Sequence, residues 1–413
     1  MRGAPPARPR ALFRASGLFD GVTGSTERDR ALLVDGGSVV AVGPYRDLRG
    51  SSGEEHDFGS SVILPGFVDA HTHITIRPGE GDQHGQFRMP PVWQAIRGVR
   101  NVADMLSSGV TTARIMSEAH GIDFEFRAAV ARGEVAGPRL LVSGFGLSPP
   151  GGHGSGEWGV AGPAALRAAV QERAALRADH IKVFMTGGVS SAGSQLTESN
   201  YDLAECTAIV TAARQAGITA AAHALGGPGV DIALEAGIHS IEHGTMLTPP
   251  QLAAIERTGT WLVLTTSILF APEAIESGDG QVPQIMDKLL SARSYMLSVV
   301  AGMRSVRRLA LGTDSMHGLF GREIKWLVAH GWTPSQALLA GTRNGGELIS
   351  DPRVGVLRPG SFADFVVVPA DPLVDVDAVG MVSVVYRGGH RVASGGRVTP
   401  APEAEAVAVE TPG

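Results

Sequence analysis

Two histidines one residue apart, His71 and His73, end an apolar stretch over residues 64–70. Such a stretch is typical of a short buried strand. Side chains at positions i and i+2 of an extended strand point to the same side, so both imidazoles can bind one metal ion. The pair alone would also fit two histidines in a polar loop, so the metal hypothesis depends on ligands elsewhere in the chain.

Four further residues of metal-binding type lie in or directly after other predicted strands: Lys182, His223, His243 and Asp314. Polar residues at the carboxyl ends of strands line the active site of a parallel α/β barrel. Each residue also has a structural interpretation. His223 and His243 can be core histidines bonded to carbonyl groups, and Asp314 can cap a helix or pair with Arg322. Because five predicted strands offer such a residue, the sequence favours a metal site.

Lys182 lies within an apolar strand, although the chain has only three lysines against 32 arginines. A snorkelling or salt-bridged lysine is the structural alternative. Burial lowers the pKa of a lysine, and a neutral amine can take up carbon dioxide to form a carbamate. The two oxygens of a carbamate can bridge two metal ions.

The elements that must position these residues change character along the chain. Both ends, residues 11–63 and 354–398, carry short strands and turn signals, including a hairpin at Asp35-Gly36-Gly37, and we predict one small β-sandwich domain built from both. Residues 64–353 alternate strands with helices, which predicts a (β/α)8 TIM-like barrel of the α/β class. The predicted strands are 66–70, 111–115, 139–143, 180–184, 219–222, 240–242, 261–265 and 309–312, and the clearest helices are 91–108, 123–132, 163–177, 201–215, 249–257 and 334–349.

A doubly wound open sheet is the competing architecture for this middle part. No G-x-G-x-x-G motif opens a helix after its first strand, which counts against a dinucleotide-binding version. Residues 1–10 are rich in Pro and Arg and lack the apolar core of a signal peptide, and residues 399–413 are mostly Pro, Ala and Glu. Both tails are predicted to be disordered.

Composition argues against several partners. The 413 residues carry a net charge of −6 and no basic patch long enough to indicate nucleic acid. No run of 18 apolar residues occurs, so no membrane span is predicted. Cys206 is the single cysteine, so no disulfide can form within the chain, which favours a reducing cytoplasm.

Together these motifs resemble the metal-dependent amidohydrolase superfamily, in particular its imidazolonepropionase-like branch, which includes Xaa-Pro dipeptidases and ochratoxinase-like amidases. The matching segments are residues 65–73 (PGFVDAHTH), 181–188 (IKVFMTGG), 222–224 (AHA), 241–245 (IEHGT) and 312–315 (GTDS). Residues 355–364 (GVLRPGSFAD) resemble the segment with which that branch returns into its β domain.

The resemblance implies a binuclear metal centre, usually with zinc. The implied ligands of the first ion are His71, His73, the Lys182 carbamate and Asp314, and those of the second are the carbamate, His223 and His243. A hydroxide that bridges the ions would attack the substrate carbonyl, and Asp314 would pass its proton to the leaving nitrogen.

The substrate contacts are less specific. Members of this branch carry a Gly-rich loop similar to residues 148–154 (SPPGGHG), which implies that His153 holds a carboxylate or carbonyl of the substrate; the alternative is a purely structural loop. His317 is expected at the rim of the site or on plain surface. Residues 116–121 depart from the usual Asp-Leu-Gly-Gly run, and Leu225 stands where relatives often carry Tyr or His. The latter departure disfavours an Xaa-Pro dipeptidase and favours another amide or a less polar acyl group.

The leading hypothesis is a hydrolase of an amide C–N bond in a small peptide-like or N-acyl substrate, with a homo-oligomer as a further prediction. A cyclic amide (lactam) hydrolase or a deaminase is the first alternative. Deaminases of the superfamily commonly use one metal and lack the bridging lysine, so Lys182 favours amide hydrolysis. A non-catalytic binding barrel is the remote alternative.

Overall fold

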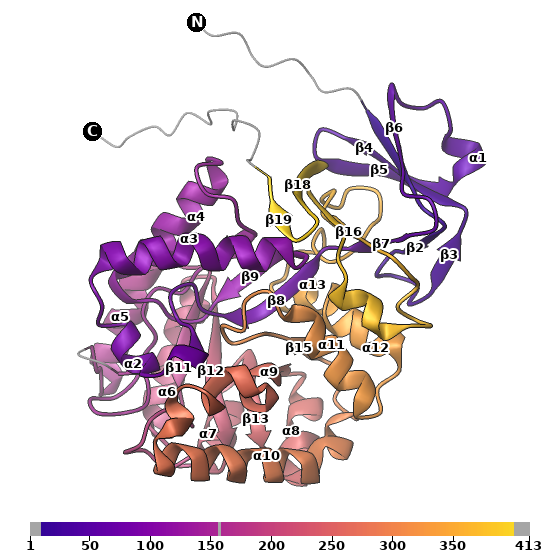
Figure 1. Ribbon diagram of the computed structural model, residues 1–413. Helices are drawn as coiled ribbons and strands as arrows, with labels where there is room; N and C mark the ends of the chain where they lie inside the picture. Colours follow the sequence, from indigo (N-terminus) through magenta and orange to yellow (C-terminus); the bar gives the residue numbers. More distant parts are fainter. Residues whose placement is uncertain (1–9, 156–157, 400–413) are drawn as a thin grey trace, which may run out of the picture.

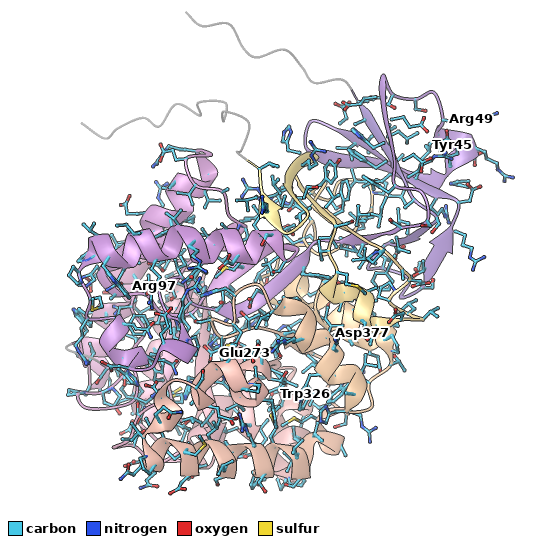
Figure 2. The ribbon with its side chains drawn as sticks, viewed as in Figure 1. Tyr45, Arg49, Arg97, Glu273, Trp326 and Asp377 are labelled. Atoms are coloured by element: carbon cyan, nitrogen blue, oxygen red, sulfur yellow. The ribbon has the colours of Figure 1, made fainter. Side chains whose placement is uncertain are left out.

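The computed structural model describes residues 10–155 and 158–399, so nearly all of both tails predicted to be disordered lies outside the described residues. The described chain has a β-rich part formed near both of its ends and a larger α/β part between them (Figure 1). Tyr45 lies in the β-rich part and Trp326 on a helix of the α/β part (Figure 2). Within the described residues, no helix is both long enough and apolar enough to cross a membrane.

The β-rich part consists of two sheets. Its strands are β1 (Ala11–Arg14), β2 (Gly17–Phe19), β3 (Thr26–Arg28), β4 (Arg30–Asp35), β5 (Ser38–Pro44), β6 (Glu54–Asp57), β7 (Val62–Pro65), β16 (Phe365–Val368), β17 (Val384–Arg387), β18 (His390–Ser394) and β19 (Arg397–Val398), with the short helix α1 (Tyr45–Leu48) after β5. The strand orders are β5-β4-β1-β6 and β19-β18-β17-β16-β7-β2-β3. The predicted hairpin is confirmed, because β4 and β5 pair antiparallel on either side of Gly36-Gly37.

Strands from both ends of the chain share the larger sheet. β7 pairs antiparallel with β16, which places Pro65 opposite Phe365. A buried apolar cluster also joins the two ends, with Phe13, Ile63 and Phe365 among its members. The packing of the two sheets as a sandwich and the domain limits stay predictions.

The α/β part contains eight parallel strands: β8 (Phe67–Thr72), β9 (Val110–Ile115), β10 (Arg139–Leu141), β11 (His180–Phe184), β12 (Thr219–Gly226), β13 (Ser240–Met246), β14 (Trp261–Leu264) and β15 (Leu309–Leu311). They form two sheets, β10-β9-β8 and β11-β12-β13-β14-β15. Seven of the eight are almost entirely buried, and β14 and β15 are apolar throughout, as is typical of strands covered on both faces.

The two parallel sheets meet at two junctions without forming one continuous ladder. Leu147, after β10, makes an isolated bridge to Val183 of β11, and the backbone N–H of Asp314 donates to the carbonyl of His71 at 2.8 Å. Both interruptions occur where a three-residue strand, β10 or β15, gives way to a loop. Across the described residues the strands therefore do not form the continuous closed barrel that we predicted.

Helices follow most of the parallel strands and lie outside them (Figure 1). The longer ones are α3 (Pro91–Ser107), α4 (Ile122–Ala131), α5 (Pro163–Ala175), α6 (Leu203–Gln215), α7 (Pro228–Ala236), α8 (Pro249–Thr258), α10 (Pro283–Met303) and α11 (Phe320–Ala329). Several begin with signals present in the sequence: α6 and α8 have capping boxes at Asp202 and Thr248, and α3, α5, α7, α8 and α10 have proline in their first turn.

The single helix predicted over residues 334–349 is wrong, because the chain forms α12 (Pro334–Ala340) and α13 (Arg343–Leu348). The backbone of Thr342 leaves the helical region, with φ −131° and ψ −97°. The break lets the carbonyl of Gly341 accept a hydrogen bond from the N–H of Val68 at 2.9 Å. A contact with β8 thus outweighs local helix propensity.

Candidate metal centre

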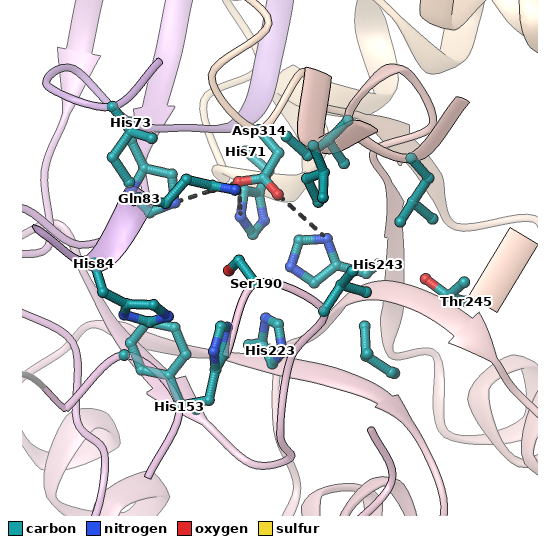
Figure 3. A pocket seen from close by; sticks show the side chains of 18 of the residues that line it. His71, His73, Gln83, His84, His153, Ser190, His223, His243, Thr245 and Asp314 are labelled. Atoms are coloured by element: carbon teal, nitrogen blue, oxygen red, sulfur yellow. Dashed lines mark ion pairs between the residues drawn. The ribbon is translucent and has the colours of Figure 1, made fainter. Parts of the chain in front are cut away.

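The ends of β8 and β15 bring together three side chains of metal-ligand type. One nitrogen each from His71 and His73 and a carboxylate oxygen of Asp314 lie within 4.8 Å of one another. Nε2 of His71 is 3.5 Å, and Nε2 of His73 is 3.3 Å, from Oδ1 of Asp314 (Figure 3). Asp314 has φ +48°, a conformation that is uncommon for a residue other than glycine and that clusters at functional sites.

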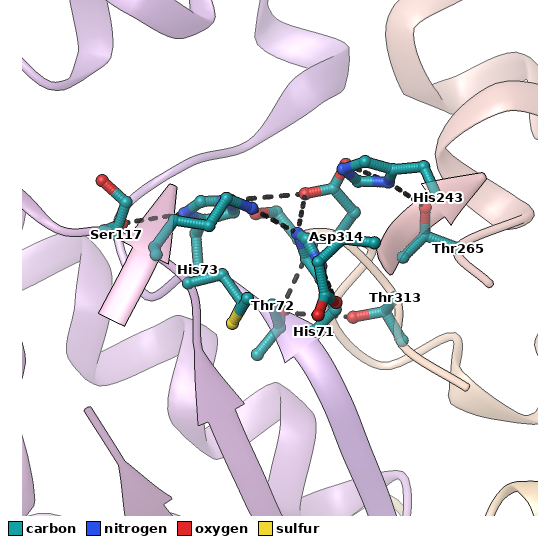
Figure 4. Close-up of polar contacts among 12 residues, drawn as sticks. His71, Thr72, His73, Ser117, His243, Thr265, Thr313 and Asp314 are labelled. Carbon is teal, nitrogen blue, oxygen red and sulfur yellow. Dashed lines mark hydrogen bonds and ion pairs between the residues drawn. The ribbon is translucent and has the colours of Figure 1, made fainter. Parts of the chain in front are cut away.

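Hydrogen bonds behind the two histidines set which ring nitrogen faces Asp314. Nδ1 of His71 lies 2.7 Å from Oε2 of Glu242, and Nδ1 of His73 lies 2.8 Å from the carbonyl oxygen of Ser117 (Figure 4 draws the second bond). Both partners are acceptors, so each Nδ1 carries the hydrogen and each Nε2 presents a lone pair. Two imidazole lone pairs and a carboxylate at these distances fit a divalent ion such as zinc.

Glu242 and Arg114 form a buried ion pair behind His71 that we did not predict. Nη1 of Arg114 is 3.1 Å from Oε1 of Glu242, and both side chains are almost fully buried. Burial opposes the ionisation of Glu242, but the charge of Arg114 and the His71 hydrogen bond outweigh it and hold the pKa of Glu242 well below its usual range. The sequence signal for this pair was a charged residue inside each of two apolar strands, β9 and β13.

Lys182 points from β11 toward the same histidine. Its Nζ lies 3.3 Å from Nε2 of His71, and the residue is 1% exposed. Burial lowers the pKa of the Lys182 ammonium to about 8, with Glu242 and Asp314 opposing the shift. The lysine is therefore neither snorkelling to the surface nor held in a close ion pair.

His223 of β12 and His243 of β13 continue the ring of side chains. The ring centroids of His71 and His243 are 4.6 Å apart, and those of His243 and His223 are 4.7 Å apart. Nε2 of His223 donates to the carbonyl of Gly187 at 3.1 Å, which leaves its Nδ1 as the lone-pair nitrogen. All six predicted metal ligands line one pocket.

The two predicted substrate contacts lie in different places. His153 lines this pocket, and its ring centroid is 4.6 Å from that of His223. His317 lies behind His73, where its Nε2 donates to the His73 carbonyl at 2.7 Å. It lines a neighbouring hollow with Arg77 instead.

Comparisons with known proteins find similarity along most of the chain. The model of the amidohydrolase family matches residues 62–392. The ochratoxinase of Aspergillus niger is 27% identical over 91% of this chain and 85% of its own length, and the imidazolonepropionase of Rhodococcus jostii is 25% identical over 88% of each chain. The solved structure of a Xaa-Pro dipeptidase with methionine bound in its active site superposes with a TM-score of 0.81 at 25% identity, covering 92% of this chain and 99% of that one.

The family match spans β7, every parallel strand and the return through β16 to β18, so it includes each strand that carries a side chain of the pocket. A match over this much of the chain carries the assignment. The chain belongs to the amidohydrolase family.

Proposed function

We propose that this protein hydrolyses an amide C–N bond of a small peptide-like or N-acyl substrate with the help of two divalent ions, most simply zinc. The observation that carries the proposal is the pair of Nε2 lone pairs of His71 and His73, both directed at Oδ1 of Asp314 by hydrogen bonds behind the rings. Two lone pairs and a carboxylate that face one another in a buried pocket are energetically costly unless they bind a cation.

The remaining predicted ligands would supply a binding position for a second metal ion. His71, His73, a carbamate on Lys182 and Asp314 would hold one ion, and the carbamate, His223 and His243 would hold the other. Carboxylation of Lys182 replaces a costly buried cation by an anion, and the absence of a close ion pair at its Nζ supports this step. When bound, such ions lower the pKa of a coordinated water and polarise the substrate carbonyl.

Asp314 is suited to move the proton. Its side chain is 21% exposed toward the pocket, whereas His71 is fully buried. Burial alone would raise the pKa of Asp314, but the neighbouring side chains of His71 and His73 outweigh burial and hold the pKa well below its usual range, so the carboxylate is ionised at neutral pH. Asp314 would accept a proton from the attacking water and deliver it to the leaving nitrogen.

A hydrolysis screen of the zinc-loaded protein tests this proposal. N-acyl amino acids, dipeptides and lactams should be compared, and we expect cleavage of linear amides that is lost on chelation and restored by metal. Preferential opening of lactams would favour the cyclic-amide alternative, and release of ammonia with a single bound metal would favour a deaminase. Two metals without turnover of any amide would contradict amide hydrolysis, and no metal would favour a binding barrel.

Leu225 lines the pocket. Relatives often carry Tyr or His at this position, so Leu225 supports a substrate other than an Xaa-Pro dipeptide. His317, which bonds the His73 carbonyl, would act by holding that ligand rather than by touching substrate. The cytoplasmic location and a homo-oligomer also stay predictions.

A further inference from the structure

Apolar side chains form much of the pocket wall beyond the metal centre, beside the polar side chains of Gln83, Ser190 and Thr245. The apolar ones are buried and come from loops, strand ends and short helices of or after four different parallel strands: Phe87, Phe184, Leu225, Ile268, Leu269 and Ile275. Burying apolar groups of a ligand against such side chains is favourable. The pocket therefore favours a substrate that carries apolar groups.

Formal charge in the pocket is confined to the metal centre. Among the described residues that line it, the only carboxylate is Asp314 and the only lysine or arginine is Lys182, and both belong to the metal centre. A substrate carboxylate would meet no arginine on these walls.

Basic side chains on the nearby helices α3 and α10 are engaged elsewhere. Arg293 pairs with Glu276 at 2.7 Å, and Arg97 pairs with Glu80 (Arg97 is labelled in Figure 2). Lys288 donates to the carbonyl of Ser191 at 2.6 Å. Redirecting any of these cations to a substrate would leave a carboxylate or a carbonyl without its partner.

Three polar side chains, His153, Ser191 and His84, are joined by hydrogen bonds at the edge of the pocket. Oγ of Ser191 lies 2.6 Å from Nδ1 of His153 and 2.7 Å from Nε2 of His84. The hydroxyl has one hydrogen, so if it donates to His153, it must accept from His84. In that arrangement Nε2 of His153 carries the hydrogen, and His153, which lines the pocket, could donate it to an oxygen of the substrate.

We infer that the substrate is an uncharged amide with apolar groups, bonded at one oxygen by His153 and otherwise enclosed largely by apolar side chains. This inference rests on the proposed function, because it describes the ligand of the same site. A second carboxylate beside Asp314 would find neutral donors such as Nε2 of Gln83 but no fixed cation at the far end of the pocket, so the loss of its hydration would be compensated only in part. Ser191 and His84 act as positioning residues that set the tautomer of His153.

A matched pair of compounds tests the inference. N-benzoyl-L-leucine carries a free carboxylate, and N-benzoyl-L-leucinamide has the same shape without the charge. Calorimetric titration of the zinc-loaded protein gives KM for a compound that is cleaved and Kd for one that is not. We expect the neutral compound to bind at least as tightly as the acid, and tighter binding of the acid by about tenfold, or 1.4 kcal/mol, would overturn the inference.

A designed cation sharpens the test. Ile268→Lys places an ammonium in the apolar wall, and Ile268→Met is the control of similar length without charge. We expect the lysine variant alone to shift the preference toward the acid by about tenfold or more, and an unchanged ratio in a folded lysine variant would contradict the inference. Release of benzoate is scored separately, so that tight binding of the neutral compound without cleavage would contradict the proposed function and leave the inference standing.

Discussion

The Nζ atom of Lys182 lies 3.3 Å from Nε2 of His71, the same nitrogen that faces Oδ1 of Asp314 at 3.5 Å. A protonated lysine at this position would compete with a metal ion for the lone pair on Nε2 of His71. A carbamate would instead add anionic oxygens to the same set. The chemical state of one nitrogen therefore decides whether the pocket repels or holds metal.

Replacement of Lys182 tests this relationship. Lys182→Ala and Lys182→Arg should both lose metal and nearly all activity, because alanine has no ligand atom and a guanidinium stays protonated and cannot be carboxylated. A short carboxylic acid should partly restore the alanine variant by standing in for the carbamate. Metal content per chain and turnover are the measurements, and Lys325→Ala, at an exposed lysine, is the control. A bare amine in electron density from an active, fully loaded crystal would contradict the bridging role.

Glu242 should control metal affinity through the tautomer of His71. The two carboxylate oxygens of Glu242 accept hydrogen bonds from His71, Ser240 and Arg114. The amide of Glu242→Gln has only one oxygen and cannot accept all three bonds. We expect metal affinity to fall about 10- to 100-fold, the usual effect of losing such a partner. Competition with a chelating dye measures it, and the ring nitrogen shifts of His71 report the tautomer in the metal-free protein. Unchanged affinity in a folded variant would mean that Glu242 serves stability alone.

His153 should contribute to substrate binding and not to metal binding. His153→Ala removes the N–H that we expect to reach the substrate, so KM should rise about tenfold, the loss of one hydrogen bond, at constant metal content. Ser191→Ala should raise KM less and alter the ring nitrogen shifts of His153, because it frees the tautomer. Normal kinetics on the true substrate for both variants would mean that His153 and Ser191 have only a structural role.

Stability should depend on pH through Asp123, which lies apart from the metal ligands. Burial raises the pKa of Asp123 from 3.8 to about 6, although the N–H groups of Ser143 and Gly144 donate to it. The folded state thus holds this proton more tightly than the unfolded state. The resulting stabilisation is complete below about pH 4 and is lost as the pH rises through about 6.

Asp123→Asn should remove this dependence. Between pH 4 and pH 7 the wild type should lose about 2 kcal/mol more unfolding free energy than the variant does. Urea denaturation of the metal-free protein measures the difference, and Asp287→Asn, at an exposed carboxylate on α10, is the control. A constant offset between wild type and Asp123→Asn across this range would contradict the assignment.

The sequence predicted the elements and ligands that depend on local pattern. The predicted strand 180–184 agrees with β11, and the spacing of His71 and His73 places both beside Asp314. Periodicity cannot reveal which distant strands become neighbours, and so the pairing of Arg114 with Glu242 was missed. The wall residues after β14 were missed because they lie in the short irregular helices α9 (Ser267–Phe270) and η3 (Pro272–Glu276).

Tertiary contacts also overrode local pattern at the predicted helix 334–349. Its sequence has no proline after Pro334, yet the helix breaks at Gly341 and Thr342 to bond the backbone of β8. His317 showed the opposite problem. Its place after the last parallel strand indicated the rim of the pocket, but its side chain bonds backward to His73.

The pairing of β7 with β16 constrains the order in which this protein can fold. During synthesis β7 emerges early, and its partner emerges only after the entire segment that carries the parallel strands. Closing so long a loop is entropically costly and slow unless the intervening segment has already become compact. Gly66 alone separates β7 from β8, which leads to His71 and His73. A truncation that removes β16 would therefore expose an unpaired strand edge next to the first two metal ligands, where nascent chains are prone to aggregate.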